Sequence, residues 1–533
     1  MKRVRACCIG IVAVSFVVSA AACGGGGSSS TPDGGPAEAS TPDATQPGDA
    51  PSDEASAHAS GPDAPEEGAA DAPDAASDAP ADTTDAGPCA TDFWVDPTGG
   101  NDMTGTGCAS TDADAGTTSC AWRTITHATQ AIGRPCGPTR LHVIGPATFG
   151  AAETYPLQIR QNVVLTTEGG AIELDVPPTT AVGISVTGAG SGIRGGPGAP
   201  LTITGAASAD GGLVAGAQIG IDFQFNAVST LENVVVSYFS SSGIKGETGS
   251  SLDVPQGLVA TSNYTGAYLS GSVTIHVDRA TTSFNNNTFG VTLFSGAVSV
   301  VGTSGGMMQV NGNGNGFALE NGASLTIPPT AAASFDGNTG TALTVEDTSS
   351  VTMTGTPGVA PGTGTITVSN NPGNGIIFNA PTTGAASQST LTGVVVYGNG
   401  ARGVYIDGAG APRIKMRRSI VLANGFNGVW IDHATNVASV DLGTTDAGDG
   451  GVDYGYNVLQ AAPDAGPNAG AGLCLSSAAD AGVVTAAGNV FSGPRDCSLL
   501  DAGMLTSTSD CSGNVDVGIF PGAGDVLTAN CAH

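Results

Sequence analysis

Apolar and variable positions alternate in a repeating pattern between residues 219 and 432. In each repeat a glycine precedes an apolar residue, a variable residue and a second apolar residue. The anchoring glycines, at steps of 23 to 35 residues, are Gly220, Gly243, Gly266, Gly290, Gly316, Gly340, Gly375, Gly403 and Gly428. Side chains alternate between the two faces of a strand, so the apolar residues of a triplet point to the same side. The pattern predicts one short strand per repeat, with the apolar pair turned inward.

A step near 24 residues is the length of one β-helix coil with three short strands and three turns. The expected inward pairs are Ile221/Phe223, Ala267/Leu269, Val291/Leu293, Phe317/Leu319, Ile376/Phe378, Val404/Ile406 and Val429/Ile431. After Gly340 the triplet fits poorly, and the rule places Ala342 and Thr344 on the outside. The longest step contains the Gly-, Pro- and Thr-rich stretch 354–365, which we interpret as a loop insertion. We therefore predict an all-β fold, a right-handed single-stranded parallel β-helix of about ten coils, with its repeats over residues 183–435.

Six asparagines stand three or four residues before an anchor: Asn263, Asn287, Asn313, Asn371, Asn399 and Asn424. Asparagine tolerates the left-handed backbone conformation that a sharp corner requires. In stacked coils the side-chain amides of such residues can also bond one another. We expect these asparagines to occupy one corner of the β-helix.

The front of the chain carries a family signature. Its residues are Trp94, Val95, Gly100, Asn101, Asp102, Gly105, Thr106, Trp122, Arg123, Thr124, Ile125 and Ala128. This set resembles the N-terminal signature of a largely uncharacterised bacterial family of right-handed β-helix proteins, in the pectate-lyase-like superfamily. The resemblance implies a short helix that caps the first coil, begun by Thr124 or Thr126 and ended by Gly133 and Pro135. Ala121 replaces the usual proline. The fold hosts lyases, hydrolases and adhesins alike, so the resemblance implies little about activity.

The first 22 residues have a basic start, an apolar stretch and a small-residue end, the form of a secretory signal peptide. The next residue is Cys23, in "AAAC", which resembles the lipobox at which bacterial lipoproteins are acylated. With Gly24 following, this resemblance implies an exported lipoprotein, anchored at the outer membrane or cell surface through Cys23. Residues 23–88 are rich in Ala, Asp, Pro and Gly without an aromatic residue, and predict a disordered tether.

Eight further cysteines fall into two groups, one at each end of the repeats. We expect disulfides within each group, because the chain reads as exported and no CxxC pair suggests zinc. The front group, in a cap with the first coils over 89–182, is Cys89, Cys108, Cys120 and Cys136; the back group, in irregular coils and a cap over 436–533, is Cys474, Cys497, Cys511 and Cys531. The pairing within each group stays open.

The formal charge of −30 argues against nucleic-acid binding, since phosphates would be repelled. We expect a monomer without a cofactor, with Ca²⁺ as the one candidate ion.

Tyr405, Asp407, Trp430 and Asp432 are expected to form a two-by-two outward patch on neighbouring coils. Aromatic faces beside carboxylates suit sugar rings, and two close carboxylates suit Ca²⁺ or acid/base chemistry. Lys415 and Arg417 lie in a basic stretch that follows Asp407 in the same coil. They are weak candidates for holding an acidic substrate, and the alternative is a basic stripe that neutralises nearby acids. His127, His142 and His276 are interpreted as structural.

Two functions follow from these observations. The first is a non-catalytic surface lipoprotein that binds glycan or another envelope component. The second is a polysaccharide lyase or glycoside hydrolase for acidic polysaccharide, using Asp407 and Asp432 with Lys415 or Arg417. The first is preferred because enzymes of this fold need a denser polar cleft than the repeats provide.

Overall fold

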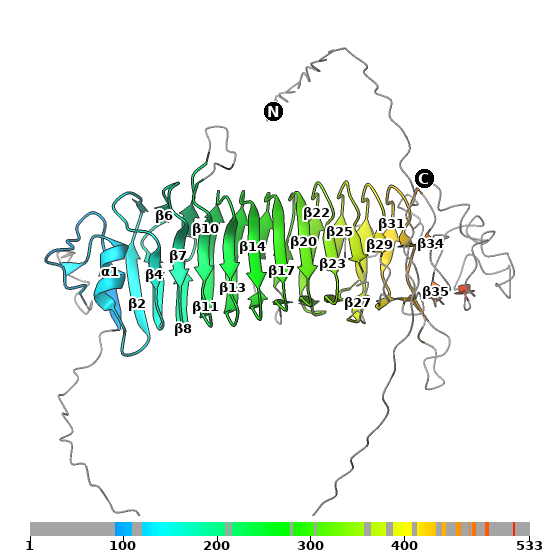
Figure 1. The fold of residues 1–533 in the computed structure, drawn as a ribbon, viewed down its shortest axis with the longest axis horizontal. Helices are drawn as coiled ribbons and strands as arrows, with labels where there is room; N and C mark the ends of the chain where they lie inside the picture. The colour runs from blue at the N-terminus through cyan, green and yellow to red at the C-terminus, as the bar shows by residue number, and fades with distance from the viewer. Residues whose placement is uncertain are drawn as a thin grey trace, which may run out of the picture. The chain divides into compact units, whose positions relative to one another are not determined.

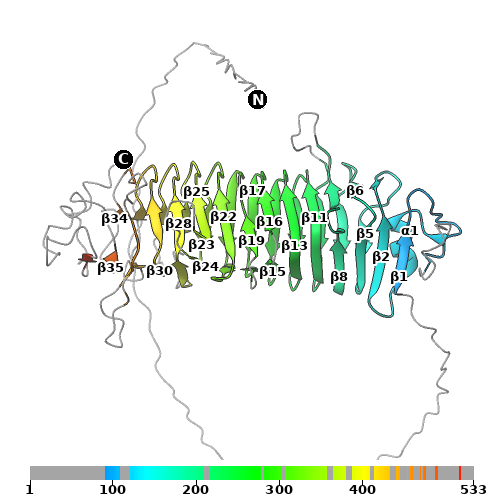
Figure 2. The ribbon, with the colours of Figure 1, turned by 180° about the vertical axis from the view of Figure 1, so that it is seen from behind.

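The computed structural model describes residues 91–108, 120–207, 213, 216–277, 281–302, 306–356, 364–379, 387–407, 413–432, 440–443, 453, 455–459, 468–469, 472–475, 486–489 and 515–517. These residues form a parallel β-solenoid of about ten turns with one short helix, as the repeat predicts. Its strands stack in three columns, seen from two sides in Figures 1 and 2. The handedness of the coil stays a prediction.

The first column is a twelve-stranded parallel sheet that contributes one strand per coil. Its strands are β4 (Leu157–Ile159), β7 (Val182–Val186), β10 (Ile219–Phe223), β12 (Ser242–Gly246), β14 (Thr265–Ser270), β17 (Phe289–Phe294), β20 (Asn315–Glu320), β23 (Leu343–Glu346), β26 (Ile376–Asn379), β29 (Val404–Asp407), β32 (Val429–Asp432) and β34 (Leu473–Leu475). These are the strands that the glycine-anchored triplets predict.

The second column begins at the N-terminal end of the solenoid. It consists of β1 (Asp92–Val95), β2 (Thr139–Ile144), β5 (Val163–Glu168), β8 (Ala189–Arg194), β11 (Val228–Ser237), β13 (Ser251–Thr261), β15 (Thr274–Val277), β18 (Val298–Val301), β21 (Ser324–Ile327), β24 (Ser350–Thr354), β27 (Ser389–Thr392), β30 (Ile414–Arg417) and β33 (Val440–Asp441).

The third column shares the long strands β11 and β13 with the second, so the two form one 22-stranded sheet. Its other strands are β3 (Ala147–Phe149), β6 (Ile172–Asp175), β9 (Leu201–Thr204), β16 (Thr281–Asn285), β19 (Met307–Gln309), β22 (Ala332–Asp336), β25 (Ile366–Ser369), β28 (Val394–Tyr397) and β31 (Ile420–Leu422). Outside the columns, β35 (Ala486–Asn489) pairs antiparallel with β36 (Val515–Val517). The predicted insertion lies between β24 and β25.

The interior is the apolar column that the triplets predict. Val291 is in register with Phe317, and further along the stack Val404 is in register with Val429. All four are at most 3% exposed. Burying a side chain of this size stabilises a fold by about 1.5–3 kcal/mol, so the stacked pairs hold the solenoid together.

The coil at β23 corrects one predicted register. Leu343 and Val345 pair with Phe317 and Leu319 and point inward, whereas Thr344 pairs with Ala318. Ala342, expected on the outside, is fully buried and takes the place that glycine holds in other coils. The prediction that Gly340 anchors this coil was therefore wrong by two residues, because the coil carries alanine at the anchor.

A ladder of buried asparagine side chains runs along one corner of the stack. Each side-chain amide nitrogen donates to the side-chain oxygen of the asparagine one coil later, at 2.7–3.2 Å. The ladder consists of Asn263, Asn287, Asn313, Asn338, Asn371, Asn399, Asn424 and Asn468. Backbone N–H groups of the same residues donate to the same oxygens. These amides therefore find partners although water cannot reach them.

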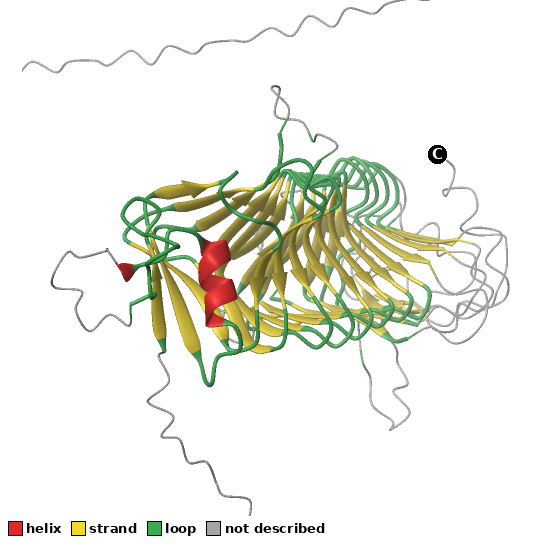
Figure 3. Cartoon of the chain, turned by 60° about the vertical axis from the view of Figure 1, so that its left-hand side comes forward, coloured by secondary structure: helices red, strands yellow, loops and turns green. Residues whose placement is uncertain are grey.

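Helix α1 (Ile125–Ile132) lies at the N-terminal end of the described coils, shown in red in Figure 3. Thr124 is its N-cap and Gly133, at φ 60°, its C-cap, as predicted. Asp102 accepts bonds from the backbone N–H groups of Arg123 and Thr124, at 2.7 and 3.1 Å. Buried Glu153 accepts from those of Ile125 and Thr126. Asp102, from the motif that resembles the family signature, thus binds the start of this helix together with Glu153. That α1 caps the stack stays a prediction.

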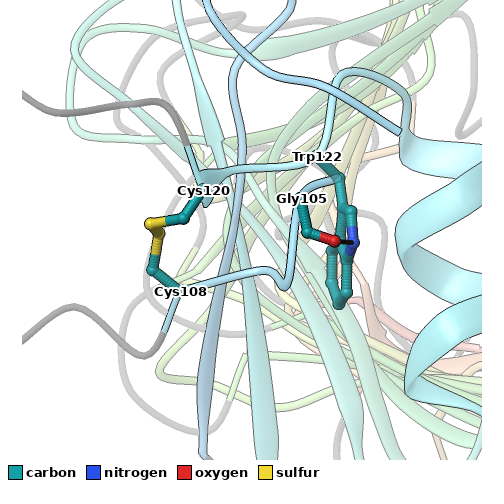
Figure 4. The surroundings of a disulfide bond; sticks show 4 residues. All are labelled: Gly105, Cys108, Cys120 and Trp122. Carbon is teal, nitrogen blue, oxygen red and sulfur yellow. Dashed lines mark hydrogen bonds between the residues drawn. A yellow bond between two sulfur atoms is a disulfide. The ribbon is translucent and has the colours of Figure 1, made fainter. Parts of the chain in front are cut away.

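Trp122 lies against two glycines of the signature, Gly100 and Gly105, and against Gly107 beside them. Its indole Nε1 donates to the Gly105 carbonyl at 3.0 Å (Figure 4). A Cβ on Gly107 would lie 2.4 Å from the indole ring, and one on Gly100 would lie 2.2 Å from the Trp122 carbonyl oxygen. Side chains at these positions would push the loop off the tryptophan.

Of the front cysteines, Cys108 and Cys120 form a disulfide beside this loop (Figure 4), and Cys136 is also disulfide-bonded. The signal peptide, Cys23, the tether, Cys89, Cys497, Cys511 and Cys531 lie outside the described residues, as does the side chain of Cys474. No helix within the described ranges is long and apolar enough to cross a membrane.

Candidate binding site on the side of the solenoid

The four residues predicted as a ligand patch lie side by side on β29 and β32. Tyr405 is in register with Trp430, and Asp407 with Asp432, as the repeat predicts. The two aromatic rings meet edge to face with centroids 6.1 Å apart. Asp407 is half-buried, whereas the side chain of Asp432 is outside the described part of the structure.

Arg402 changes what these rings can do. Its guanidinium carbon lies 3.6 Å from the centroid of the Trp430 ring and 4.6 Å from that of Tyr405. Trp430 is only 6% exposed. Trp430 is therefore not the exposed aromatic platform that the pattern predicts, because Arg402 covers its ring. Strand alternation predicts on which side of the sheet a side chain lies, but not which other residue packs over it. A sugar would have to displace a cation that the ring holds favourably.

Lys415 and Arg417 lie on β30, in the second column, whereas Asp407 and Asp432 lie in the first. Their charged ends bind Asp453: Lys415 Nζ at 2.7 Å, and Arg417 through Nε and Nη2 at 3.0 and 2.8 Å. Arg417 Nη2 also donates to Asp441 at 2.7 Å. These bonds hold the pKa of Asp453 well below its usual range, the bond from Arg417 contributing most.

The predicted basic stripe does neutralise nearby acids. Arg417, however, is only 7% exposed, whereas a stripe on the surface predicts an exposed side chain. The structure does not join Lys415 and Arg417 to Asp407 and Asp432 in one site.

A polar groove, missed from the sequence, lies on the second column near the N-terminal end. It has a volume of about 850 Å³ and is lined by Thr166, Glu168, Arg194, Glu232, Asn233 and Gln256, with glycines of the turns after β5 and β8. Arg194 Nε lies 3.8 Å from Glu232 Oε2, too far for a hydrogen bond. The Arg194 side chain is 45% exposed, so its donors face the groove and solvent.

One residue from each of six coils forms a row along the second column, and the last four of them line the groove. Register pairs Trp94 with His142, His142 with Thr166, Thr166 with Arg194, Arg194 with Glu232 and Glu232 with Gln256. Figure 2 labels the strands of the row, β1, β2, β5, β8, β11 and β13. We call this set the polar row. The glycine-anchored repeat did not mark this row, because the anchors lie in the first column only and the row belongs to the second.

His142 ties three coils of the polar row together. Its Nε2 lies 2.9 Å from Asp92 Oδ1, its Nδ1 lies 2.5 Å from Glu168 Oε1, and its ring stacks on Trp94. The hydrogen bond with His142 lowers the pKa of Asp92 from its ordinary value. With both nitrogens engaged, His142 positions Glu168 at the groove edge. The interpretation of His142 as structural is therefore compatible with its contacts.

Among the described residues, no group of three or more His, Cys, Asp or Glu side chains is arranged so that it could hold a metal ion. The arrangement that remains is a groove with donors from Arg194 and amides, and acceptors from Glu168 and Glu232. Such mixed donors and acceptors suit a hydroxyl-rich ligand.

Comparison with known proteins identifies no family for this chain. No family model and no curated protein matches this chain. Among solved structures, the A-module of the mannuronan C-5 epimerase AlgE6 from Azotobacter vinelandii is similar, at 13% identity and a TM-score of 0.31. The alignment covers 69% of this chain and 88% of that module. A likeness this distant carries no argument about the site.

Proposed function

We propose that this protein is a non-catalytic surface lipoprotein that binds glycan through the polar groove of its first coils. The observation that carries the proposal is the groove itself. There Arg194 offers hydrogen-bond donors, and Glu168 and Glu232 offer acceptors, on one side of the stack. The Tyr405–Trp430 patch supports it less well, because Arg402 covers the tryptophan.

Groove substitutions test the binding role. We expect Arg194→Met and Glu232→Gln each to weaken glycan binding by about three- to tenfold, the loss of one or two exposed hydrogen bonds to ligand. Calorimetry or affinity electrophoresis of the full chain measures this. Arg413→Met is the matched control, since Arg413 is exposed on another part of the second column. Equal binding by all three variants and the parent would contradict the proposal.

The enzyme alternative requires a different result. A lyase or hydrolase for acidic polysaccharide needs Asp407 and Asp432 to act together with a nearby cation, but Lys415 and Arg417 are engaged by Asp453. Incubation with pectins and uronic-acid polymers should therefore yield no unsaturated product. Product formation that Asp407→Asn abolishes would overturn the non-catalytic proposal.

Anchoring at Cys23 is tested separately. Two acyl signals hold a protein firmly at a membrane, whereas a chain without them is released. We expect Cys23→Ser to move the protein from the membrane fraction to the soluble fraction and to abolish incorporation of a labelled fatty acid. Cys7→Ser, within the expected signal peptide, is the control that should leave both unchanged.

A further inference from the structure

We propose that the groove ligand is an extended polysaccharide without acidic groups, lying along the polar row parallel to the axis of the stack. This inference rests on the proposed glycan-binding function. It differs from that function by fixing the direction, the length and the charge of the ligand.

The direction follows from the register. The six residues of the polar row come from six successive coils and are aligned across the sheet. Coils of a parallel sheet repeat at about 4.8 Å, close to the length of one pyranose unit. A chain of sugars that follows the row therefore meets the groove residues of the row, from Thr166 to Gln256, on successive units. A chain lying across the coils would leave the row after one or two units.

The charge follows from the groups around Arg194. Glu168 and Glu232 line the same groove, and Arg194 is the cation beside them. Asp92 is not among the groove residues and bonds to His142 instead. A uronic-acid polymer would meet repulsion from these two groove carboxylates, on a chain whose net formal charge is −30. Hydroxyl groups, or the ammonium of an amino sugar, match the carboxylate acceptors instead.

The two ends of the row have different chemistry. Gln256 and Glu232 are polar, whereas Trp94 is partly exposed and presents an aromatic ring three coils away from Arg194. Carbon-bound hydrogens on the face of a sugar can pack on such a ring while the hydroxyls bond elsewhere. Trp94 should therefore contribute only when the ligand is long enough to reach it.

Oligosaccharides of increasing length test the direction. For the full chain we expect the affinity for neutral or amino-sugar oligomers to rise with each unit and to level off at about six units, one per residue of the row. Trp94→Ala should lower the affinity for six-unit ligands about fivefold or more, and leave two-unit ligands unchanged. Trp94→Phe, with circular dichroism as the folding check, should recover most of the loss. An affinity already maximal at two units would overturn the inference.

Polymers of different charge test the ligand class. We expect a neutral glucan and a chitosan to bind and an alginate or polygalacturonate not to bind at low salt. Glu168→Gln and Glu232→Gln should weaken chitosan binding more strongly than binding of the neutral glucan, because only chitosan loses an ion pair as well as a hydrogen bond. Preferential binding of an acidic polymer would overturn this inference but leave the glycan-binding proposal standing. Binding to none of the polymers would remove the proposed function and this inference together.

Discussion

At the residue scale, the sequence pattern predicts the positions of most asparagines at this corner but not their backbone conformation. Six ladder members could be predicted from their spacing, but their backbone conformation was predicted wrongly. The positive φ angles belong to the residue before: Ser262, Asn286, Gly312, Gly337, Asn370, Gly398 and Ala423. The corner thus separates two tasks, a left-handed residue for the bend and an asparagine for the bonds. Asn338 was missed because its coil was anchored at the wrong residue, and Asn468 because it lies beyond the regular repeats.

Replacing one ladder residue should be costly. In Asn313→Ala, the backbone N–H and the amide nitrogen of Asn287 both lose their acceptor, at a buried site. Stranded buried donors cost about 1–3 kcal/mol each, so we expect a loss of about 2–4 kcal/mol in the free energy of unfolding. Denaturant titration measures it. Exposed Asn315→Ala is the control and should change stability by less than about 0.5 kcal/mol. A loss in both variants alike would contradict the role of the ladder.

At the element scale, the strands were easier to predict than the contacts that their side chains make with residues distant in the sequence. A triplet predicts which residues enter the core because alternation is local. It does not predict that Arg402 lies over Trp430, or that Arg417 binds Asp453, 36 residues later in the chain. Helix α1 was predictable because its cap, Thr124, and its end, Gly133, are local signals.

Asp102 should control the pH dependence of α1. Burial opposes its charge, but bonds from the Thr124 hydroxyl and from two backbone N–H groups prevail and lower the pKa of Asp102. A lowered folded-state pKa means that its stabilisation is complete above the unfolded value of about 4 and is lost as the pH falls through the folded value. Asp102→Ala should therefore cost about 1–2 kcal/mol at pH 7, and the difference from the parent should shrink below about pH 4.

Unfolding curves from pH 7 to 2, followed by tryptophan fluorescence, check this expectation. Asp253→Ala is a suitable control, because Asp253 is exposed on β13. A difference between Asp102→Ala and the parent that stays constant from pH 7 to 2 would rule out the carboxylate as its cause.

At the scale of the whole molecule, each coil contacts mainly the coils before and after it. Stability in such a stack is close to a sum of nearest-neighbour terms. The effect of Asn313→Ala should accordingly be largest in β19 to β23 and fade within two or three coils on either side. Hydrogen exchange of the variant and the parent measures the spread. Equal loss of protection from β4 to β32 would mean that the stack unfolds as one unit.

The polar groove is also a property of the whole stack. Its residues come from β5, β8, β11 and β13, so that Thr166 and Gln256 are 90 positions apart in the chain, and no local pattern marks them as neighbours. Only the register of three columns brings them together. The column that was easiest to trace in the sequence is not the one that carries the candidate site.

The amide ladder also has a sense of direction. From Asn263 to Asn424, each amide donates to the coil that comes later in the chain. In a chain that folds from its amino end, a ladder asparagine such as Asn263 can donate at once to a backbone carbonyl earlier in the chain. Its backbone N–H and its other amide hydrogen have no acceptor until the next coil has formed. Each ladder bond therefore has to wait for the next coil. The ladder would form in order from the amino end, always one coil behind the last coil that has folded.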